Sequence, residues 1–136
     1  MIRFDVPGEP GAKGRPRFSA RGGFVKTYTD KKTELYESLV RNAYLIKYAS
    51  SEPLEGEIKV EIQAHFSIPK STSKKSREEM VAGRIRPTKK PDIDNIAKTV
   101  LDALNGIAFE DDKNITELIV GKHYSDQPHV EVCIWN

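Results

Sequence analysis

The chain has 136 residues, of which 38% are hydrophobic and 31% are charged, and its formal net charge is +2. These values are typical of a folded globular protein, and residues 1–136 are expected to form a single small domain. No apolar run approaches the roughly 20 residues that span a bilayer, and the first residues lack the pattern of a signal peptide. The one cysteine, Cys133, excludes a disulfide framework and a thiolate zinc site within one chain. The composition therefore favours a cytoplasmic protein.

The first third of the chain predicts a strand, a long loop and a helix. Residues 2–6 form the strand, and the glycines and prolines of residues 8–23 predict a loop without regular structure. A helix is expected to begin near Asp30, a good N-cap residue. Apolar side chains at helical spacing predict the stripe that this helix turns toward the core: Leu35, Leu39, Ala43 and Ile46.

The middle of the chain predicts a strand followed by a short polar helix. Residues 58–66 alternate strictly between apolar and polar side chains, which indicates a strand with one buried face. Residues 73–82 are typical of a short polar helix, and residues 84–91 form a basic loop that contains proline.

The last third predicts a helix and two strands. Residues 94–105 form the helix, which stops at Asn105-Gly106 and buries one side: Ala97, Val100, Leu101 and Leu104. Residues 115–124 and 129–135 are predicted to pair as an antiparallel hairpin. The order β-α-β-α-α-β-β indicates an α+β fold, in which helices pack on a mixed sheet.

The charges are separated along the sequence. Residues 8–26 contain five basic side chains against one acidic one, and residues 70–90 contain eight against two. The sign reverses between residues 91 and 112, where six acidic side chains face one lysine. This distribution suggests a surface for a polyanion beside a site for cations. Alternatively, each run is only a solvated surface.

Five aspartates and one lysine lie where they can act together. Asp92 and Asp94 are two residues apart, so in an extended segment their carboxylates point the same way. On the helix that follows, Asp94, Lys98 and Asp102 are spaced i, i+4 and i+8 and share one face. After a short connection that follows the helix, Asp111 and Asp112 add two more carboxylates.

Clustered carboxylates stay ionised when a cation neutralises them, and oxygen ligands suit magnesium. Such an ion can bind a phosphate, activate water and stabilise the leaving oxygen. Lys98 can place a positive charge beside the phosphate as negative charge builds up. The spacing also allows a purely structural reading: Asp92 or Asp94 caps the helix, Asp102 pairs with Lys98, and Asp111-Asp112 forms a turn.

Residues 90–98, Lys-Pro-Asp-Ile-Asp-Asn-Ile-Ala-Lys, are followed by Leu-Asp-Ala-Leu-Asn-Gly and then by Asp-Asp. This pattern resembles the RusA family of Holliday-junction resolvases, which are small bacterial and phage endonucleases (crossover junction endodeoxyribonucleases). The resemblance implies a RusA-like fold with Asp92, Asp94 and Asp112 as magnesium ligands and Lys98 as a catalytic lysine. Asp112 is preferred to Asp111 because it matches the family's catalytic aspartate, and Asp102 is interpreted as a supporting or structural residue.

The segment Gly14–Arg17 also resembles the basic N-terminal loop of that family. Phosphate contacts are expected from Lys13, Arg15, Arg17, Lys89 and Lys90. The implied function is Mg²⁺-dependent resolution of four-way DNA junctions by paired symmetric cuts in recombination and repair. A homodimer is expected, because a junction is two-fold symmetric. The alternatives are a nucleic-acid-binding module without catalysis, or a metal-dependent nuclease acting on flap DNA or RNA.

The histidines and the cysteine carry weaker signals. His65, His123 and His129 are scattered over predicted strands without metal-ligand spacing. They are therefore interpreted as ordinary surface or core side chains. Cys133 is interpreted as a small core residue rather than a nucleophile.

Overall fold

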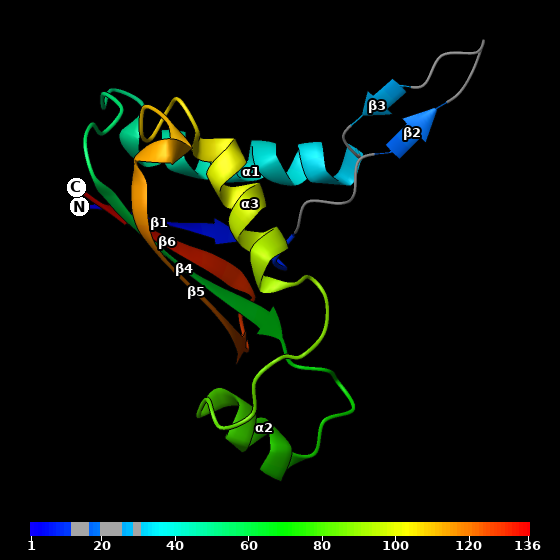
Figure 1. Cartoon of the computed structure of the whole chain (residues 1–136). Helices are drawn as coiled ribbons and strands as arrows, with labels where there is room; N and C mark the ends of the chain where they lie inside the picture. Colours follow the sequence, from blue (N-terminus) through cyan, green and yellow to red (C-terminus); the bar gives the residue numbers. More distant parts are fainter. Residues whose placement is uncertain (12–16, 20–25, 29–30) are drawn as a thin grey trace.

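A computed structural model describes residues 1–11, 17–19, 26–28 and 31–136. Its main element is a four-stranded sheet with the strand order β1-β6-β4-β5, and two helices, α1 and α3, lie on one face of that sheet (Figure 1). A mixed sheet covered by helices is the α+β fold that the sequence predicts. The elements in chain order are β1 (Ile2–Pro7), β2 (Arg17–Ser19), β3 (Lys26–Tyr28), α1 (Lys31–Tyr48), β4 (Ile58–Ser67), α2 (Lys74–Val81), α3 (Ile93–Leu104), a 3-10 turn (Asp112–Asn114), β5 (Ile115–Ser125) and β6 (His129–Trp135).

Strand β4 forms the centre of the sheet because its alternating sequence gives it one fully apolar face. Every second side chain from Ile58 to Phe66 is buried under the helices. β6 pairs antiparallel with one edge of β4 and β5 pairs parallel with the other edge, while β1 extends the sheet beyond β6. Both edges of β4 are thus hydrogen-bonded.

The predicted hairpin between residues 115–124 and 129–135 is wrong, although both strands exist. β5 and β6 lie on opposite sides of β4, so the connection 126–128 crosses the end of that strand. Two strand spacings amount to about 10 Å, and a link of three residues can span this distance because consecutive Cα atoms are about 3.8 Å apart. A short loop therefore does not require that the two strands it joins pair with each other.

Helix α1 buries a different face from the one that the sequence predicts. Its buried side chains are Thr33, Val40 and Tyr44, and Tyr44 packs edge-on against Phe4 of β1. The predicted stripe is largely exposed, with Leu35 at 66% and Ile46 at 85%. Tyr44 favours this orientation of α1, because it buries a large ring and its hydroxyl donates a hydrogen bond to the carbonyl oxygen of Ile107 at 3.4 Å.

The predicted loop 8–23 contains one short strand. β2 pairs antiparallel with β3, and no glycine or proline lies inside either strand. Before them, Gly11 lies directly against the ring of Tyr36, where a Cβ atom would come within 2.4 Å of the ring. Burial raises the pKa of Tyr36 to about 12. This contact ties the N-terminal segment to α1.

The two remaining helices are close to their predicted bounds. Ser73 caps α2, where its hydroxyl accepts a hydrogen bond from the Ser76 amide at 3.2 Å. α3 begins at Ile93 and ends at Leu104, and Gly106 beyond it has a φ of +82° that suits glycine. Helix α1 begins at Lys31, but the predicted cap Asp30 lies outside the described residues.

Candidate active site

Helix α3 presents the predicted acidic face to solvent. Its apolar side, which includes Ile96, Val100 and Leu104, is fully buried. Asp94 and Lys98 are exposed on the opposite side, and Asp102 is half-buried one turn further along. The helical period therefore holds these three side chains in a line, as the sequence predicts.

Asp92 occupies the N-cap position of α3, and its backbone is extended, with φ −69° and ψ 155°. Its carboxylate makes no capping hydrogen bond with the described residues. The structural reading of Asp92 as a helix cap is thus not supported, and the exposed carboxylate can take another partner. Asp94 differs from its prediction: it lies inside the first helical turn, so the extended segment ends at Asp92 rather than continuing through Asp94.

The connection from α3 to Asp111 is anchored in the core. Ala108 and Phe109 are completely buried. Leu54 donates its amide to the carbonyl oxygen of Ala108 at 3.0 Å, and the Glu110 amide donates to the carbonyl oxygen of Leu54 at 3.2 Å. Because this segment is held on both sides, the aspartates that follow it are fixed relative to α3.

The two neighbouring aspartates have different environments. The Asp111 carboxylate caps the 3-10 turn and accepts a hydrogen bond from the Lys113 amide at 3.0 Å. That hydrogen bond, together with one to Asp112, lowers the pKa of Asp111. Asp111 therefore has a local structural role in this turn.

Asp112 lies in the electrostatic field of α3. Its pKa is raised first by the hydrogen bond with Asp111, then by loss of solvent and by the negative charges of Asp111 and Asp102, whereas Lys98 lowers it. Of the α3 residues, Lys98 and Asp102 are therefore the ones whose charges act on Asp112. Asp94 lies one helical turn from Lys98, and Asp92 lies just before the helix.

Among the described residues, Asp92, Asp94 and Asp112 do not bring their carboxylate oxygens within 4.8 Å of one another, so they would have to move closer to share one ion. The neighbouring carboxylates raise the pKa of Asp112, and a bound cation would offset this repulsion. Carboxylate oxygens are the ligands that magnesium prefers. Lys98 adds a positive charge on the same face. Asp102, interpreted from the sequence as a supporting residue, is one of the negative charges that raise the pKa of Asp112.

Basic side chains lie next to the aspartates. Lys89 and Lys90 are exposed directly before them, and the Lys90–Pro91 peptide bond is cis. The ammonium of Lys89 lies 5.7 Å from the centre of the Phe66 ring. Lys13 and Arg15 lie outside the described residues, and Arg17 begins β2.

Other basic residues of the second basic run are bound within the protein. Arg77 pairs with Asp126 at 3.0 Å, Arg84 pairs with Glu79, and Arg86 donates to the carbonyl oxygen of Lys122 at 2.8 Å. Within the described part of the chain, by contrast, no hydrogen bond or ion pair engages Lys74, Lys75 or Lys90. The arginines of this basic run thus contact other parts of the protein, whereas these three lysines can contact a ligand.

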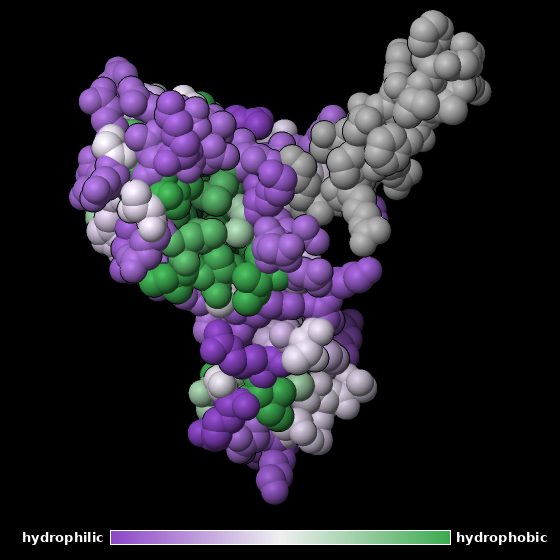
Figure 2. Space-filling view, viewed as in Figure 1, coloured by the Kyte–Doolittle hydropathy of each residue, from purple (hydrophilic) through white to green (hydrophobic). Residues whose placement is uncertain are grey.

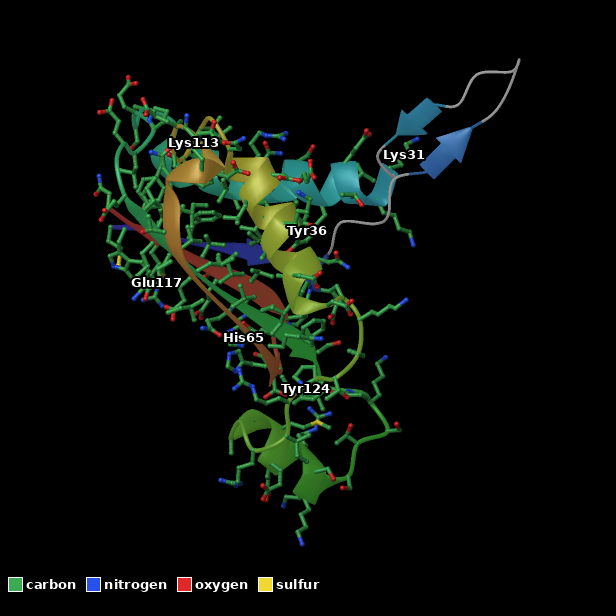
Figure 3. The ribbon with its side chains drawn as sticks, in the orientation of Figure 1. Lys31, Tyr36, His65, Lys113, Glu117 and Tyr124 are labelled. Carbon is green, nitrogen blue, oxygen red and sulfur yellow. The ribbon has the colours of Figure 1, made fainter. Side chains whose placement is uncertain are left out.

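The histidines are not scattered, which corrects the interpretation from sequence. His65 of β4, labelled in Figure 3, pairs in register with His123 of β5 and with His129 of β6. His65 lies on the sheet face opposite to the buried side chains of β4. The sequence gives no local sign of this row, because the three residues become neighbours only when β4 lies between β5 and β6. Cys133 is half-buried on β6 rather than in the core, and burial raises the pKa of its thiol.

A helix-covered mixed sheet with aspartates and Lys98 on one helix, beside exposed lysines, is compatible with a phosphodiester hydrolase. Comparison with known protein families makes this specific: residues 7–135 match the family described as Endodeoxyribonuclease RusA. The chain belongs to the RusA family. It is therefore an enzyme of a family of DNA endonucleases that are metal-dependent and act as Holliday-junction resolvases, as the sequence motif indicates.

A relative in Bacillus subtilis (strain 168) has the same extent. The chain is 38% identical over 135 residues to the uncharacterized protein YqaN, and the match covers 98% of this chain and 94% of the relative. Within residues 1–11, 17–19, 26–28 and 31–136, no helix is both long and apolar enough to cross a membrane.

Proposed function

We propose that residues 1–136 act as one nuclease domain that resolves four-way DNA junctions by Mg²⁺-dependent hydrolysis of two symmetry-related phosphodiesters. The observation that supports this proposal is the row Asp94-Lys98-Asp102 on the solvent side of α3, because the charges of Lys98 and Asp102 act on Asp112. Membership of the RusA family supplies the class of reaction and of substrate.

Asp92, Asp94 and Asp112 are the proposed magnesium ligands. When bound, Mg²⁺ supplies a Lewis acid for the phosphate and lowers the pKa of a bound water. The carboxylates of the chain hold the ion on the face of α3, and Asp102 adds negative charge beside Asp112. The Lys98 ammonium is placed to stabilise negative charge on the phosphoryl oxygens as it increases in the transition state.

The proposed DNA contacts surround this cluster. Lys89 and Lys90 precede Asp92 in the chain, so a phosphate bound by them lies beside the metal ligands. Lys13, Arg15 and Arg17 are proposed to bind phosphates of another arm of the junction. Together these contacts recognise backbone charge and the shape of the branch rather than bases.

A homodimer is proposed as the active form. Two cuts related by two-fold symmetry need two active sites, one for each strand. An apolar surface is available for such an association: Figure 2 shows hydrophobic side chains gathered between α3 and β5, and Ile93 and Leu118 of these elements are 45% and 42% exposed.

The proposed function is tested by cleavage of four substrates with matched sequences. A four-way junction, a flap, a linear duplex and a single-stranded RNA are incubated with the protein, with Mg²⁺ and with a chelator instead. We expect paired symmetric nicks in the junction, dependent on Mg²⁺, with ends that DNA ligase can reseal. Preferential cutting of the flap or the RNA would assign a different substrate, and binding without cutting in any metal would assign a binding module.

A further inference from the structure

The uncovered face of the sheet carries a second group of potential metal ligands. In register, His65 lies between His123 and His129. The His65 ring stacks on the His129 ring with centroids 4.3 Å apart, and on the His123 ring at 5.0 Å. Glu131 lies two residues after His129 on β6, so its side chain points to the same face.

One ring nitrogen of His65 lacks a hydrogen-bond partner in the described part of the chain. Its Nε2 atom is buried and has no hydrogen-bond partner among the described residues. An unpaired buried polar atom destabilises the fold unless a ligand or a water molecule pairs with it.

His129 and Glu131 place side-chain ligand atoms near the Nε2 atom of His65. The Nδ1 atom of His129 lies 2.7 Å from the carbonyl oxygen of Gln127. Such a hydrogen bond to one ring nitrogen orients the other nitrogen of a metal-binding histidine. The Nε2 atom lies 3.3 Å from Oε1 of Glu131, and the His65 Nε2 atom lies 3.9 Å from that same oxygen.

We propose that His65, His129 and Glu131 form a binding site for a transition-metal ion of the zinc class, separate from the aspartate cluster and on the opposite face of the sheet. Their three ligand atoms all lie within 4.8 Å of one another. Metal–ligand bonds of 2.0–2.2 Å with tetrahedral angles separate ligand atoms by about 3.3–3.6 Å, so the stacked imidazoles would rotate to direct their nitrogens at one ion. Two imidazoles and one carboxylate favour zinc over magnesium, which prefers oxygen ligands.

The surroundings leave room for a fourth ligand. A hollow of about 460 Å³ borders the site and is lined by His65, His129, Tyr124 and the 125–127 segment, so water can reach the ion. Asp5 of β1 lies opposite Glu131 in the sheet register and adds negative charge to the same face. A bound ion would join β4 to β6 and thereby stabilise the fold.

His123 belongs to the row of histidines but not to the proposed site. Its Nε2 atom is occupied by Gln63 Oε1 at 2.6 Å and by the Arg86 guanidinium at 3.2 Å. This difference provides a matched control, because His65→Phe and His123→Phe remove the same ring nitrogens from neighbouring strands.

The test measures metal binding and thermal stability of the full chain after removal of metals with a chelator. Zn²⁺ is titrated by calorimetry in the presence of excess Mg²⁺, and Co²⁺ is titrated with detection of its visible absorption. We expect one Zn²⁺ per chain, tetrahedral-type Co²⁺ absorption and a rise in Tm with zinc. His65→Phe and His129→Ala should weaken zinc binding at least tenfold and abolish the rise in Tm, whereas His123→Phe and Asp94→Asn should bind zinc as the unmodified chain does.

The result that overturns the proposal is an unmodified chain that binds no stoichiometric zinc, or zinc binding that His65→Phe and His129→Ala leave unchanged. Equal loss of binding in His123→Phe would also overturn it, because the whole histidine row would then be responsible. If His65→Phe does not fold, Glu131→Gln decides the question: loss of zinc binding supports the site, and retained binding overturns it.

Discussion

Asp111 and Asp112 are neighbours in sequence, but their carboxylates have different environments. The Asp111 carboxylate accepts a hydrogen bond from the Lys113 amide and caps the 3-10 turn, whereas the charges of Lys98 and Asp102 act on Asp112. An asparagine retains a capping oxygen but loses the charge that holds a cation. The two substitutions therefore distinguish a structural from a metal-binding aspartate.

We expect Asp112→Asn to reduce the rate of junction cleavage at least a hundredfold, a scale typical of lost electrostatic catalysis, with junction binding retained. Asp92→Asn and Asp94→Asn should behave in the same way. Asp111→Asn should lower the rate less than tenfold, because its oxygen still caps the turn. Single-turnover cleavage and gel-shift binding provide the two measurements, and similar rates for Asp111→Asn and Asp112→Asn would show that the assignment is wrong.

Lys98 is expected to act on the transition state rather than on binding. It lies one turn from both Asp94 and Asp102 on the exposed face of α3. Lys98→Ala should slow the chemical step by about a hundredfold with little change in Kd for the junction. Lys113→Ala serves as the control, since it removes an equal charge next to Asp112. A Lys98→Ala protein that binds weakly but cuts at the normal rate when saturated would refute this role.

At the scale of elements, α1 shows where a helical pattern misleads. Two stripes are compatible with its sequence, one formed by leucines and the other centred on Val40 and Tyr44, and the structure buries the second. We expect Tyr44→Ala to lower the free energy of unfolding by about 3 kcal/mol, because it leaves a cavity beside Phe4. Leu35→Ala and Leu39→Ala should lower it by less than about 0.5 kcal/mol. Urea unfolding measures all three, and a larger loss for Leu35→Ala than for Tyr44→Ala would contradict the observed packing.

The sequence predicts elements better than it predicts their partners. The alternation of residues 58–66 and the stripe of α3 are local properties, so the strand β4 and the line Asp94-Lys98-Asp102 could be foreseen. The pairing of β5 with β4 is not local, because a short loop permits either a hairpin or a crossing. The histidine row depends on that pairing, and so the sequence could not indicate it. The proximity of Asp112 to α3 likewise depends on the buried anchor at Phe109.

The basic segment before α3 provides a prediction about DNA binding. The log of the binding constant should fall linearly with the log of the salt concentration, by about 0.9 for each neutralised phosphate of a duplex arm. Lys89→Ala and Lys90→Ala should each reduce this slope by about one unit, equally for all sequences. Arg84→Ala is the matched control, because Arg84 is already paired with Glu79. Unchanged slopes in Lys89→Ala and Lys90→Ala would mean that these lysines are only solvated.

For the whole molecule, the sheet ends in an edge strand with apolar surface beside it. β5 has a neighbour only on the β4 side within the described sheet, and the apolar surface between α3 and β5 is open (Figure 2). A surface of this kind next to the helix that carries the aspartates suits an association that sets two active sites in one two-fold particle.

The protein should therefore sediment as a dimer of twice the subunit mass and bind a four-way junction far more tightly than a linear duplex of the same sequence. Leu118→Glu places a charge in the apolar surface and should shift the protein toward monomer, with loss of paired cutting. Ile46→Glu on α1, a position that is 85% exposed and distant in sequence from that surface, should leave the dimer intact. Analytical ultracentrifugation measures the mass, and simultaneous nicking of both strands in a cruciform plasmid measures paired cutting. A monomer that cuts junction and duplex equally would refute the resolvase proposal while leaving the nuclease assignment in place.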